Sequence, residues 1–86
     1  MFRLVYSRLA EKQLAKLSAQ TALRILKGCE RLNTKPFPDD KHVKKLKGYH
    51  ALYRLRIGDY RVVFTIAGQM VEVIDIISKQ DFQNSG

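Results

Sequence analysis

The chain has 86 residues, and 16 Lys or Arg against 8 Asp or Glu give it a formal net charge of +8. A chain this short has room for one hydrophobic core, which predicts a single domain over residues 1–86. Its hydrophobic content of 45% is ordinary for a globular domain and argues against disorder. Cys29 is the only cysteine, which excludes an internal disulfide and a multi-cysteine metal site.

The charge and the apolar runs together narrow the class of protein. No apolar run approaches the roughly 18 residues that a membrane-spanning helix needs. The N-terminus carries Arg3 but no apolar stretch of the kind that a secretory signal contains. These features predict a reduced, cytoplasmic protein with no membrane partner. A charge of +8 on so small a body predicts attraction to a polyanion.

The first half of the chain predicts a strand followed by two helices. Residues 2–6 are typical of a short strand, and Ser7 and Ser18 are each suited to cap a helix. Apolar residues recur at helical spacing after each cap. They are Ala10, Leu14 and Leu17 in the first helix, and Ala22, Ile25, Leu26, Cys29 and Leu32 in the second. The two prolines within residues 33–40 then predict a loop.

The second half predicts three strands. Residues 51–57, 60–66 and 70–77 are runs rich in Tyr, Val, Ile and Phe, and short polar or glycine-containing segments separate them. The predicted order is therefore β-α-α-β-β-β. We expect an α+β fold in which two N-terminal helices pack on one face of a mainly antiparallel sheet. The other face of the sheet would be free for function.

The positive charge is concentrated in one segment. Residues 41–61 contain seven Lys or Arg and one acidic residue, Asp59, so this segment alone carries +6. Further cations recur at helical spacing in both predicted helices, and they are Arg8, Lys12 and Lys16 in the first, and Arg24, Lys27 and Arg31 in the second. These two stripes are either solvated helix faces or docking surfaces for a large anionic partner, since like charges at this spacing repel each other.

The hairpin at the centre of this segment gathers three arginines. A two-residue turn at residues 58–59 pairs Arg56 directly with Arg61. Because side chains alternate between the two faces of a strand, Arg54 shares their face. The opposite face receives the apolar side chains that suit packing against helices, namely Tyr53, Leu55, Ile57, Tyr60, Val62 and Phe64.

These arginines need a negative partner, because like charges directly opposite in a sheet are destabilising. Two sources are open. Glu72 or Asp75 of the last strand could form an internal salt-bridge network, or a bound phosphate could supply the charge from outside. Arginine presents a planar fork of donors that matches phosphate oxygens. Three such forks on one face would suit a phosphodiester.

Three segments resemble the RelE/ParE toxin superfamily, and specifically its RelE-type branch. They are residues 46–48 (LKG), residues 52–64 (LYRLRIGDYRVVF) and residues 73–79 (VIDIISK). The resemblance spans nearly the whole chain and includes the predicted order of elements. It implies a RelE-like fold and the toxin of a type II toxin–antitoxin pair. It further implies an endoribonuclease that cuts mRNA in the ribosomal A site without a metal or other cofactor, using the RNA 2′-hydroxyl as nucleophile, and thereby inhibits translation.

Matching positions imply roles for individual residues. Arg56, Arg61 and Lys79 are the implied catalytic residues, with Arg61 stabilising the phosphate. The implied RNA-binding residues are Arg54, Lys44, Lys45, Lys47 and Phe82. Phe82 stands where RelE-type chains often have a tyrosine, so it can stack on a base but cannot transfer a proton. Arginine is a poor general base, which leaves proton removal to Lys79, to a tyrosine or to ribosomal RNA.

The expected partners are a cognate antitoxin, whose acidic segment would cover the basic groove, and the ribosome with its 16S rRNA and mRNA. Two other interpretations share the fold. One is a ParE-like inhibitor of DNA gyrase without nuclease activity, and the other is a non-toxic relative that binds only its antitoxin. His42 and His50 are expected to be polar surface residues, because two histidines without a third ligand are weak evidence for a metal site.

Overall fold

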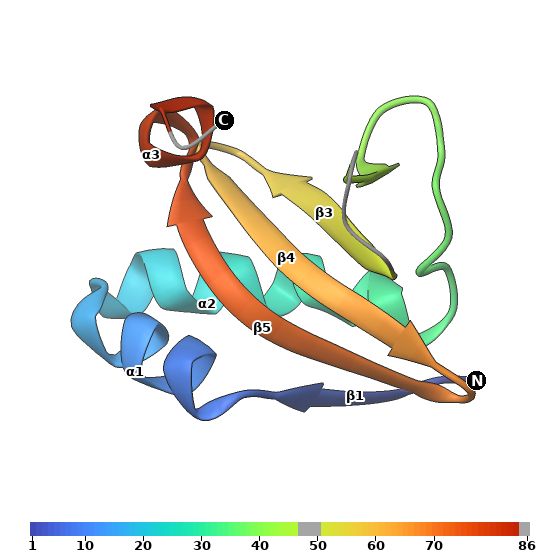
Figure 1. Ribbon diagram of the computed structural model, residues 1–86. Coiled ribbons are helices and arrows are strands. Elements are labelled where there is room, and N and C mark those ends of the chain that lie inside the picture. Colours follow the sequence, from blue (N-terminus) through green and yellow to red (C-terminus); the bar gives the residue numbers. More distant parts are fainter. Residues whose placement is uncertain (47–50, 85–86) are drawn as a thin grey trace.

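The computed structural model describes residues 1–46 and 51–84 (Figure 1). The elements in chain order are β1 (Arg3–Tyr6), α1 (Arg8–Lys16), α2 (Ala19–Cys29), a 3₁₀ turn η1 (Glu30–Asn33), β2 (Val43–Lys45), β3 (Leu52–Ile57), β4 (Tyr60–Ala67), β5 (Met70–Ser78) and α3 (Lys79–Asn84). The predicted strand, two helices and three further strands are all present. The structure adds η1, β2 and α3, which were not predicted. None of the described helices is long and apolar enough to cross a membrane.

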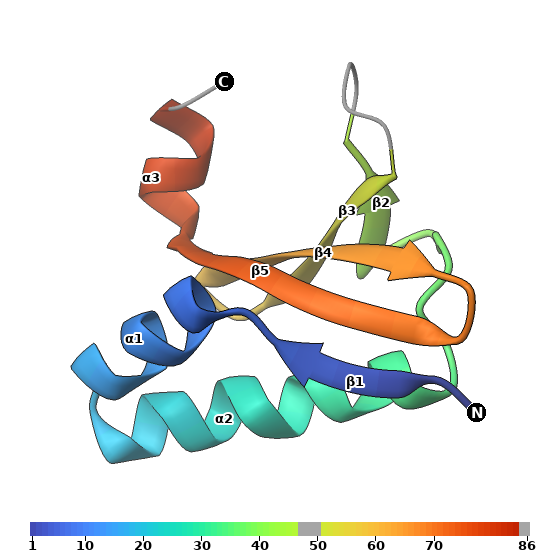
Figure 2. The same cartoon turned by 60° about the horizontal axis from the view of Figure 1, so that its bottom comes forward.

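The described strands form one sheet in the order β1-β5-β4-β3-β2. β1 runs parallel to β5, and every other neighbouring pair is antiparallel. Figure 2 shows α1 and α2 together beneath the sheet, as predicted, while α3 and the β2–β3 end of the sheet rise on the opposite side. β2 and α3 therefore make the open face of the sheet concave.

Both predicted caps are formed. The Ser7 hydroxyl accepts a hydrogen bond from the Ala10 backbone N–H at 3.0 Å, and the Ser18 hydroxyl accepts one from the Thr21 N–H at 3.2 Å. Such caps satisfy amide groups that have no partner within the helix. The core between the helices and the sheet contains Ala10, Ile25, Cys29, Leu32, Val43, Leu55, Val62, Phe64, Val71, Val73 and Ile76. Leu26 was expected in this core but is 38% exposed, because it faces outward from α2.

A β-bulge at Ile74 changes which residues of β5 face the core. Phe64 of β4 pairs with Val73, but its neighbour Val63 pairs with Asp75, so Ile74 is an extra residue. A bulge of this kind reverses the alternation beyond it. Asp75 is thereby removed from the core side and Ile76 takes its place, with 6% of its surface exposed.

Helix α1 holds this irregular part of β5. The Ser7 hydroxyl donates to the Ile74 carbonyl at 3.1 Å, while the Gln13 side chain accepts from the Ile76 N–H at 2.7 Å and donates to the Asp75 carboxylate at 2.6 Å. β1 pairs with β5 only as far as Val73, so Gln13 supplies hydrogen bonds that a neighbouring strand would otherwise provide.

Replacing Gln13 with alanine should therefore cost more than an ordinary surface substitution. We expect a loss of about 1–3 kcal/mol in the free energy of unfolding, because a part-buried N–H and a carboxylate lose their partner. Urea denaturation would measure this loss. Gln20→Ala, at an exposed position of α2, is the matched control. Equal midpoints for the two variants would contradict the role given to Gln13.

Candidate nucleic-acid site

The β3–β4 hairpin has the register that the sequence predicts. Arg56 pairs with Arg61, and Arg54 pairs with Val63. Gly58 begins the turn with φ of +54°, a left-handed conformation that glycine adopts without a steric cost. Arg54, Arg56 and Arg61, which we call the arginine cluster, therefore share the open face of the sheet.

Arg61 is the buried member of the cluster. Only 8% of it is exposed, and it is the one buried charged residue within the described part of the chain. Its Nη1 donates to the backbone carbonyls of Gly58 and Tyr60, both at 3.1 Å. These two bonds hold the guanidinium against the hairpin turn, and both acceptors are neutral backbone carbonyls rather than carboxylates.

Arg54 is crowded by its neighbours. Partial burial lowers the pKa of its guanidinium, and the positive charges of Arg61 and Arg56 lower it further. Its Nη1 donates to the His42 carbonyl at 2.9 Å. The three charges thus lie close enough to repel one another, and an anion bound among them would relieve that repulsion.

The internal salt-bridge network that the sequence left open is not found. Among residues 1–46 and 51–84, the ion pairs within 4.0 Å are Arg31–Asp39 and His42–Asp39, and neither involves the arginine cluster. The Asp75 carboxylate is instead bonded to Gln13 of α1. The cluster therefore has no acidic partner in the described structure. Of the two sources of negative charge that the sequence allows, an external anion is the one left.

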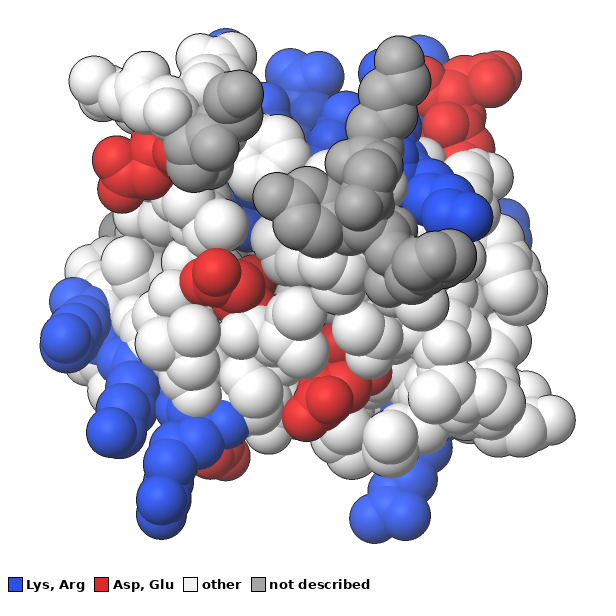
Figure 3. Space-filling model, in the orientation of Figure 1, with Lys and Arg blue, Asp and Glu red and all other residues white. Residues whose placement is uncertain are grey.

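A cavity of about 640 Å³ opens beside the cluster. Its wall is mostly cationic and consists of Asp40, Lys41, His42, Lys44, Arg54, Arg56 and Gly58. In Figure 3, Lys and Arg side chains gather at the top of the molecule around this region, and a second group lies at the lower left over the helices. The first group is the site, which we call the cationic cavity. Arg61 adjoins it through its bond to the Gly58 carbonyl.

The loop before β2 forms one wall of this cavity and is held by Asp39. Hydrogen bonds from the backbone N–H groups of Val43 and His42 hold the pKa of the Asp39 carboxyl well below its usual range, with Arg31 and Lys41 adding smaller contributions. The charged carboxylate is therefore part of the folded loop. His42 is a surface residue, as expected, with 51% of its side chain exposed. It also lines the cavity, because β2 pairs with β3 and brings the loop to the arginines.

The three predicted lysines of residues 44–47 fall into three different places. Lys44 pairs with Arg54 and lines the cationic cavity. Lys45 pairs with Tyr53, which puts it on the opposite face of the sheet from the arginines. Lys47 lies outside the described residues.

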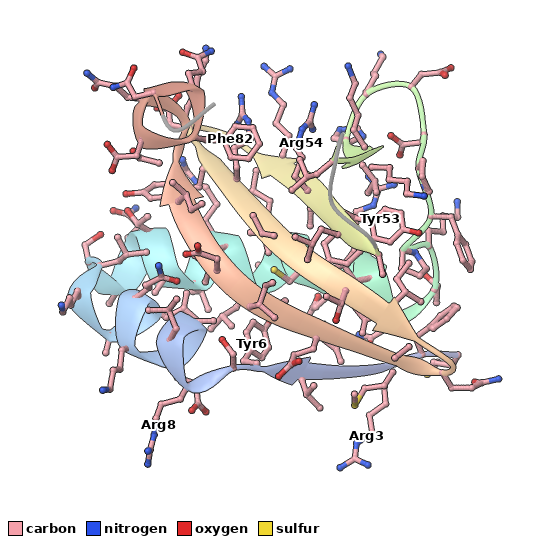
Figure 4. All side chains as sticks on the ribbon, viewed as in Figure 1. Arg3, Tyr6, Arg8, Tyr53, Arg54 and Phe82 are labelled. Atoms are coloured by element: carbon pink, nitrogen blue, oxygen red, sulfur yellow. The ribbon has the colours of Figure 1, made fainter. Side chains whose placement is uncertain are left out.

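Lys79 and Phe82 both belong to α3. Lys79 lines a separate cavity of about 400 Å³ with Asp59, Ser78, Gln80 and Gln83, so the structure does not bring it into the cationic cavity. Its backbone N–H donates to the Asp59 carbonyl at 2.6 Å, which ties the start of α3 to the hairpin turn. Figure 4 shows Phe82 and Arg54 at the same end of the open sheet face.

Other reactive side chains are part of the core. Cys29 is fully buried, and burial raises the pKa of its thiol to about 11, so it is not a nucleophile at neutral pH. Tyr53 stacks on Phe64 with ring centroids 5.6 Å apart, and Tyr60 also packs against the core, as predicted. No group of three or more potential metal ligands occurs among the described residues.

Known proteins resemble this chain over most of its length. The family model of the ParE toxin of the type II toxin–antitoxin system parDE matches residues 4–81. Toxin RelE3 of Methanocaldococcus jannaschii is 45% identical over 29 residues, which are 34% of this chain and 33% of that protein. The matched stretch thus spans one third of that relative.

Two solved structures have the same fold. The RelE–RelB complex from the archaeon Pyrococcus horikoshii OT3 contains a chain that is 28% identical, with a TM-score of 0.76 and coverage of 91% of this chain and 94% of that one. The isolated RelE toxin of E. coli is 18% identical, with a TM-score of 0.77 and coverage of 99% and 95%, respectively. The family match over residues 4–81 and this shared fold agree with the resemblance found in the hairpin. The chain therefore belongs to the RelE/ParE superfamily of toxins of type II toxin–antitoxin systems.

Proposed function

We propose that this toxin is a ribosome-dependent endoribonuclease that cuts mRNA in the A site and so stops translation in the cytoplasm. The observation that carries the proposal is the arginine cluster, whose buried member Arg61 has no carboxylate partner in the described structure. A phosphodiester would supply the missing negative charge. The similarity to RelE proteins supports RNA as the source of that phosphodiester.

The reaction that we assign needs no metal. The 2′-oxygen attacks phosphorus and the bond from phosphorus to the 5′-oxygen breaks, which gives a 2′,3′-cyclic phosphate and a free 5′-hydroxyl. Negative charge grows on the non-bridging oxygens during this step. Arg61 is already fixed by the Gly58 and Tyr60 carbonyls, so its guanidinium needs no reorganisation to stabilise that charge. Arg56, directly opposite, would contact the same phosphate.

Two proton transfers are also needed, one from the 2′-hydroxyl and one to the leaving 5′-oxygen, and guanidinium groups do not release their protons. We assign both to Lys79, whose amine would take the 2′-hydroxyl proton and return it to the 5′-oxygen. Lys79 lines its own cavity beside Asp59, but the first N–H of α3 is bonded to the turn that holds Arg61. Phe82 would stack on a base at the same end of the sheet. Lys44 and Lys45, with Lys47 of the segment outside the described residues, would contact ribosomal RNA together with the helix stripes.

The toxin would be held inactive by a cognate antitoxin. Solved structures with this fold include toxin–antitoxin complexes, such as the intact RelBE complex of E. coli. An acidic antitoxin segment would match the cationic cavity in charge, and it would occupy the place of the RNA phosphates.

One finding favours a second candidate function. The family model that matches residues 4–81 describes a ParE toxin, so inhibition of DNA gyrase without nuclease activity is the alternative. On that interpretation the cationic cavity would bind a protein or DNA surface, and no RNA bond would be cut.

A test with purified components separates the two functions. The chain is added to ribosomes stalled on a defined mRNA, and RNA ends are mapped by primer extension. In parallel, it is added to a gyrase supercoiling assay. We expect cuts within the A-site codon that require ribosomes, and unaffected supercoiling. Intact mRNA together with inhibited supercoiling would replace our proposal with the gyrase function.

A further inference from the structure

Asp39 organises a tight turn at the wall of the cationic cavity. Its Oδ1 accepts hydrogen bonds from the backbone N–H groups of Lys41 at 3.0 Å, His42 at 2.6 Å and Val43 at 3.0 Å. The Asp39 N–H donates to the Val43 carbonyl at 2.9 Å, which closes the turn. We call residues 39–43 the Asp39 turn. One carboxylate oxygen thus fixes three successive peptide groups.

The second oxygen of Asp39 ties the turn to the helical layer. Nη2 of Arg31, which belongs to η1, lies 2.6 Å from Asp39 Oδ2. The side chain of Arg31 is 29% exposed and that of Asp39 is 34% exposed, so this pair is partly shielded from water. The turn is therefore anchored at both carboxylate oxygens.

The turn bonds to the arginine cluster through a single atom, and the negative charge of Asp39 also favours the charged form of Arg54. The His42 carbonyl accepts a hydrogen bond from Arg54 Nη1 at 2.9 Å and another from the Arg56 backbone N–H at 2.9 Å. The Arg56 bond fixes the carbonyl against β3, and the Arg54 bond uses that fixed carbonyl to hold a guanidinium. The geometry thus links Asp39 to Arg54 through one intervening residue.

The hydrogen bond to the His42 carbonyl keeps Arg54 in place against repulsion by the neighbouring arginines. The charges of Arg61 and Arg56 both act against it, and none of the ion pairs in the described residues involves it. Without the His42 carbonyl, a long flexible side chain would turn toward solvent, away from the other two arginines.

We propose that Asp39 is a positioning residue, which holds Arg54 in the arginine cluster through the Asp39 turn and the His42 carbonyl. The inference rests on the proposed function, because it takes the cluster to be the RNA phosphate site. Asp39 does not touch the phosphate itself.

The neighbouring Asp40 provides a control, because positioning predicts opposite changes in RNA affinity when Asp39 and Asp40 are replaced. Asp40 lines the same cavity, and none of the side-chain hydrogen bonds or ion pairs of the described residues involves it. By charge alone, removing either aspartate from a cationic site should strengthen the binding of a polyanion. Positioning predicts the opposite result for Asp39, since loss of the turn releases Arg54.

The experiment measures binding of a short, fluorescein-labelled single-stranded RNA whose 2′-O-methyl groups prevent cleavage, by fluorescence anisotropy at one salt concentration. We expect Asp39→Ala to raise the Kd about tenfold, since contacts of a charged donor are worth this much or more. Asp39→Asn keeps an acceptor for the turn but not the charge facing Arg31, so its effect should be intermediate. Asp40→Ala should lower the Kd about twofold.

A double-mutant cycle distinguishes positioning from a general loss of structure. In an Arg54→Ala background, Asp39→Ala should change the Kd by less than about twofold, because the side chain that it positions is gone. In an Arg61→Ala background it should keep its full effect. If Asp39→Ala lowers the helix content seen by circular dichroism, the cycle is measured with Asp39→Asn instead.

The outcomes separate this inference from the proposed function. An unchanged Kd for Arg61→Ala would overturn the assignment of the cluster as a phosphate site. A weakened Arg61→Ala variant together with an Asp39→Ala variant that binds RNA more tightly would leave that assignment intact and overturn the positioning role. The positioning role would also be overturned if Asp39→Ala changed the Kd by the same factor in the original protein and in the Arg54→Ala background.

Discussion

Replacing Arg61 with alanine should lower ribosome-dependent mRNA cleavage by about 10²–10³-fold, which is the usual cost of removing one preorganised donor from a developing negative charge. Arg61 combines burial with a guanidinium that backbone carbonyls already fix in place. Arg61→Lys keeps the charge but not the planar fork, so its rate should fall between those of alanine and the original residue. Single-turnover cleavage on stalled ribosomes would measure all three.

The same substitution should not unfold the protein. Alanine loses two hydrogen bonds to backbone carbonyls, but it also relieves the repulsion that Arg61 exerts on Arg54. These effects oppose each other, so we expect the free energy of unfolding to change by less than about 1 kcal/mol. Arg3→Ala, at an exposed position of β1, is the control for an arginine remote from the cluster. A folded Arg61→Ala toxin that cuts mRNA at the full rate would refute the assignment.

Replacing Phe64 with alanine should have the largest effect on stability. Phe64 is fully buried in the middle of β4 and stacks on Tyr53. A buried Phe→Ala change costs about 3–5 kcal/mol, because it removes apolar contacts and leaves a cavity. This is a large fraction of the roughly 5–15 kcal/mol by which domains are stable. Urea denaturation should show a much lower midpoint.

Phe37 provides the matched control for that loss. It is also aromatic and also contacts another ring, with its centroid 5.5 Å from that of Phe2, but it is 56% exposed. Phe37→Ala should therefore lower the free energy of unfolding only slightly. The lost ring contact should contribute less than about 1 kcal/mol, and little buried surface is lost with it. Similar midpoints for the two variants would mean that Phe64 is not at the centre of the core.

The hairpin and its arginine cluster could be predicted because both depend on local rules. A two-residue turn sets the pairing of β3 with β4, and alternation then assigns each side chain to a face. The pairing of Arg56 with Arg61 follows from these two facts alone, and the structure has it. The capping serines Ser7 and Ser18 were predicted for the same reason, since a cap is recognised within four residues.

What could not be predicted depends on contacts between distant segments. Val43 is the one buried residue of the three-residue strand β2, too little for a recognisable pattern. Helix α3 has six residues and no buried side chain, so it has no apolar stripe. The bulge at Ile74 follows from hydrogen bonds to α1, more than sixty residues earlier in the chain. The link from Asp39 to Arg54 likewise requires β2 to be in place.

The parallel pairing of β1 with β5 has a consequence for how the toxin is made. β1 is the first strand to be synthesised and β5 is the last, yet they are neighbours in the sheet. While the chain is still being translated, β1 has no partner, and α1 lacks the strand that it covers. Contacts of such large sequence separation form late and slow the folding of a domain. The nascent toxin would therefore reach its active form only after β5 has been translated, and a product interrupted before β5 would be harmless to the cell that makes it.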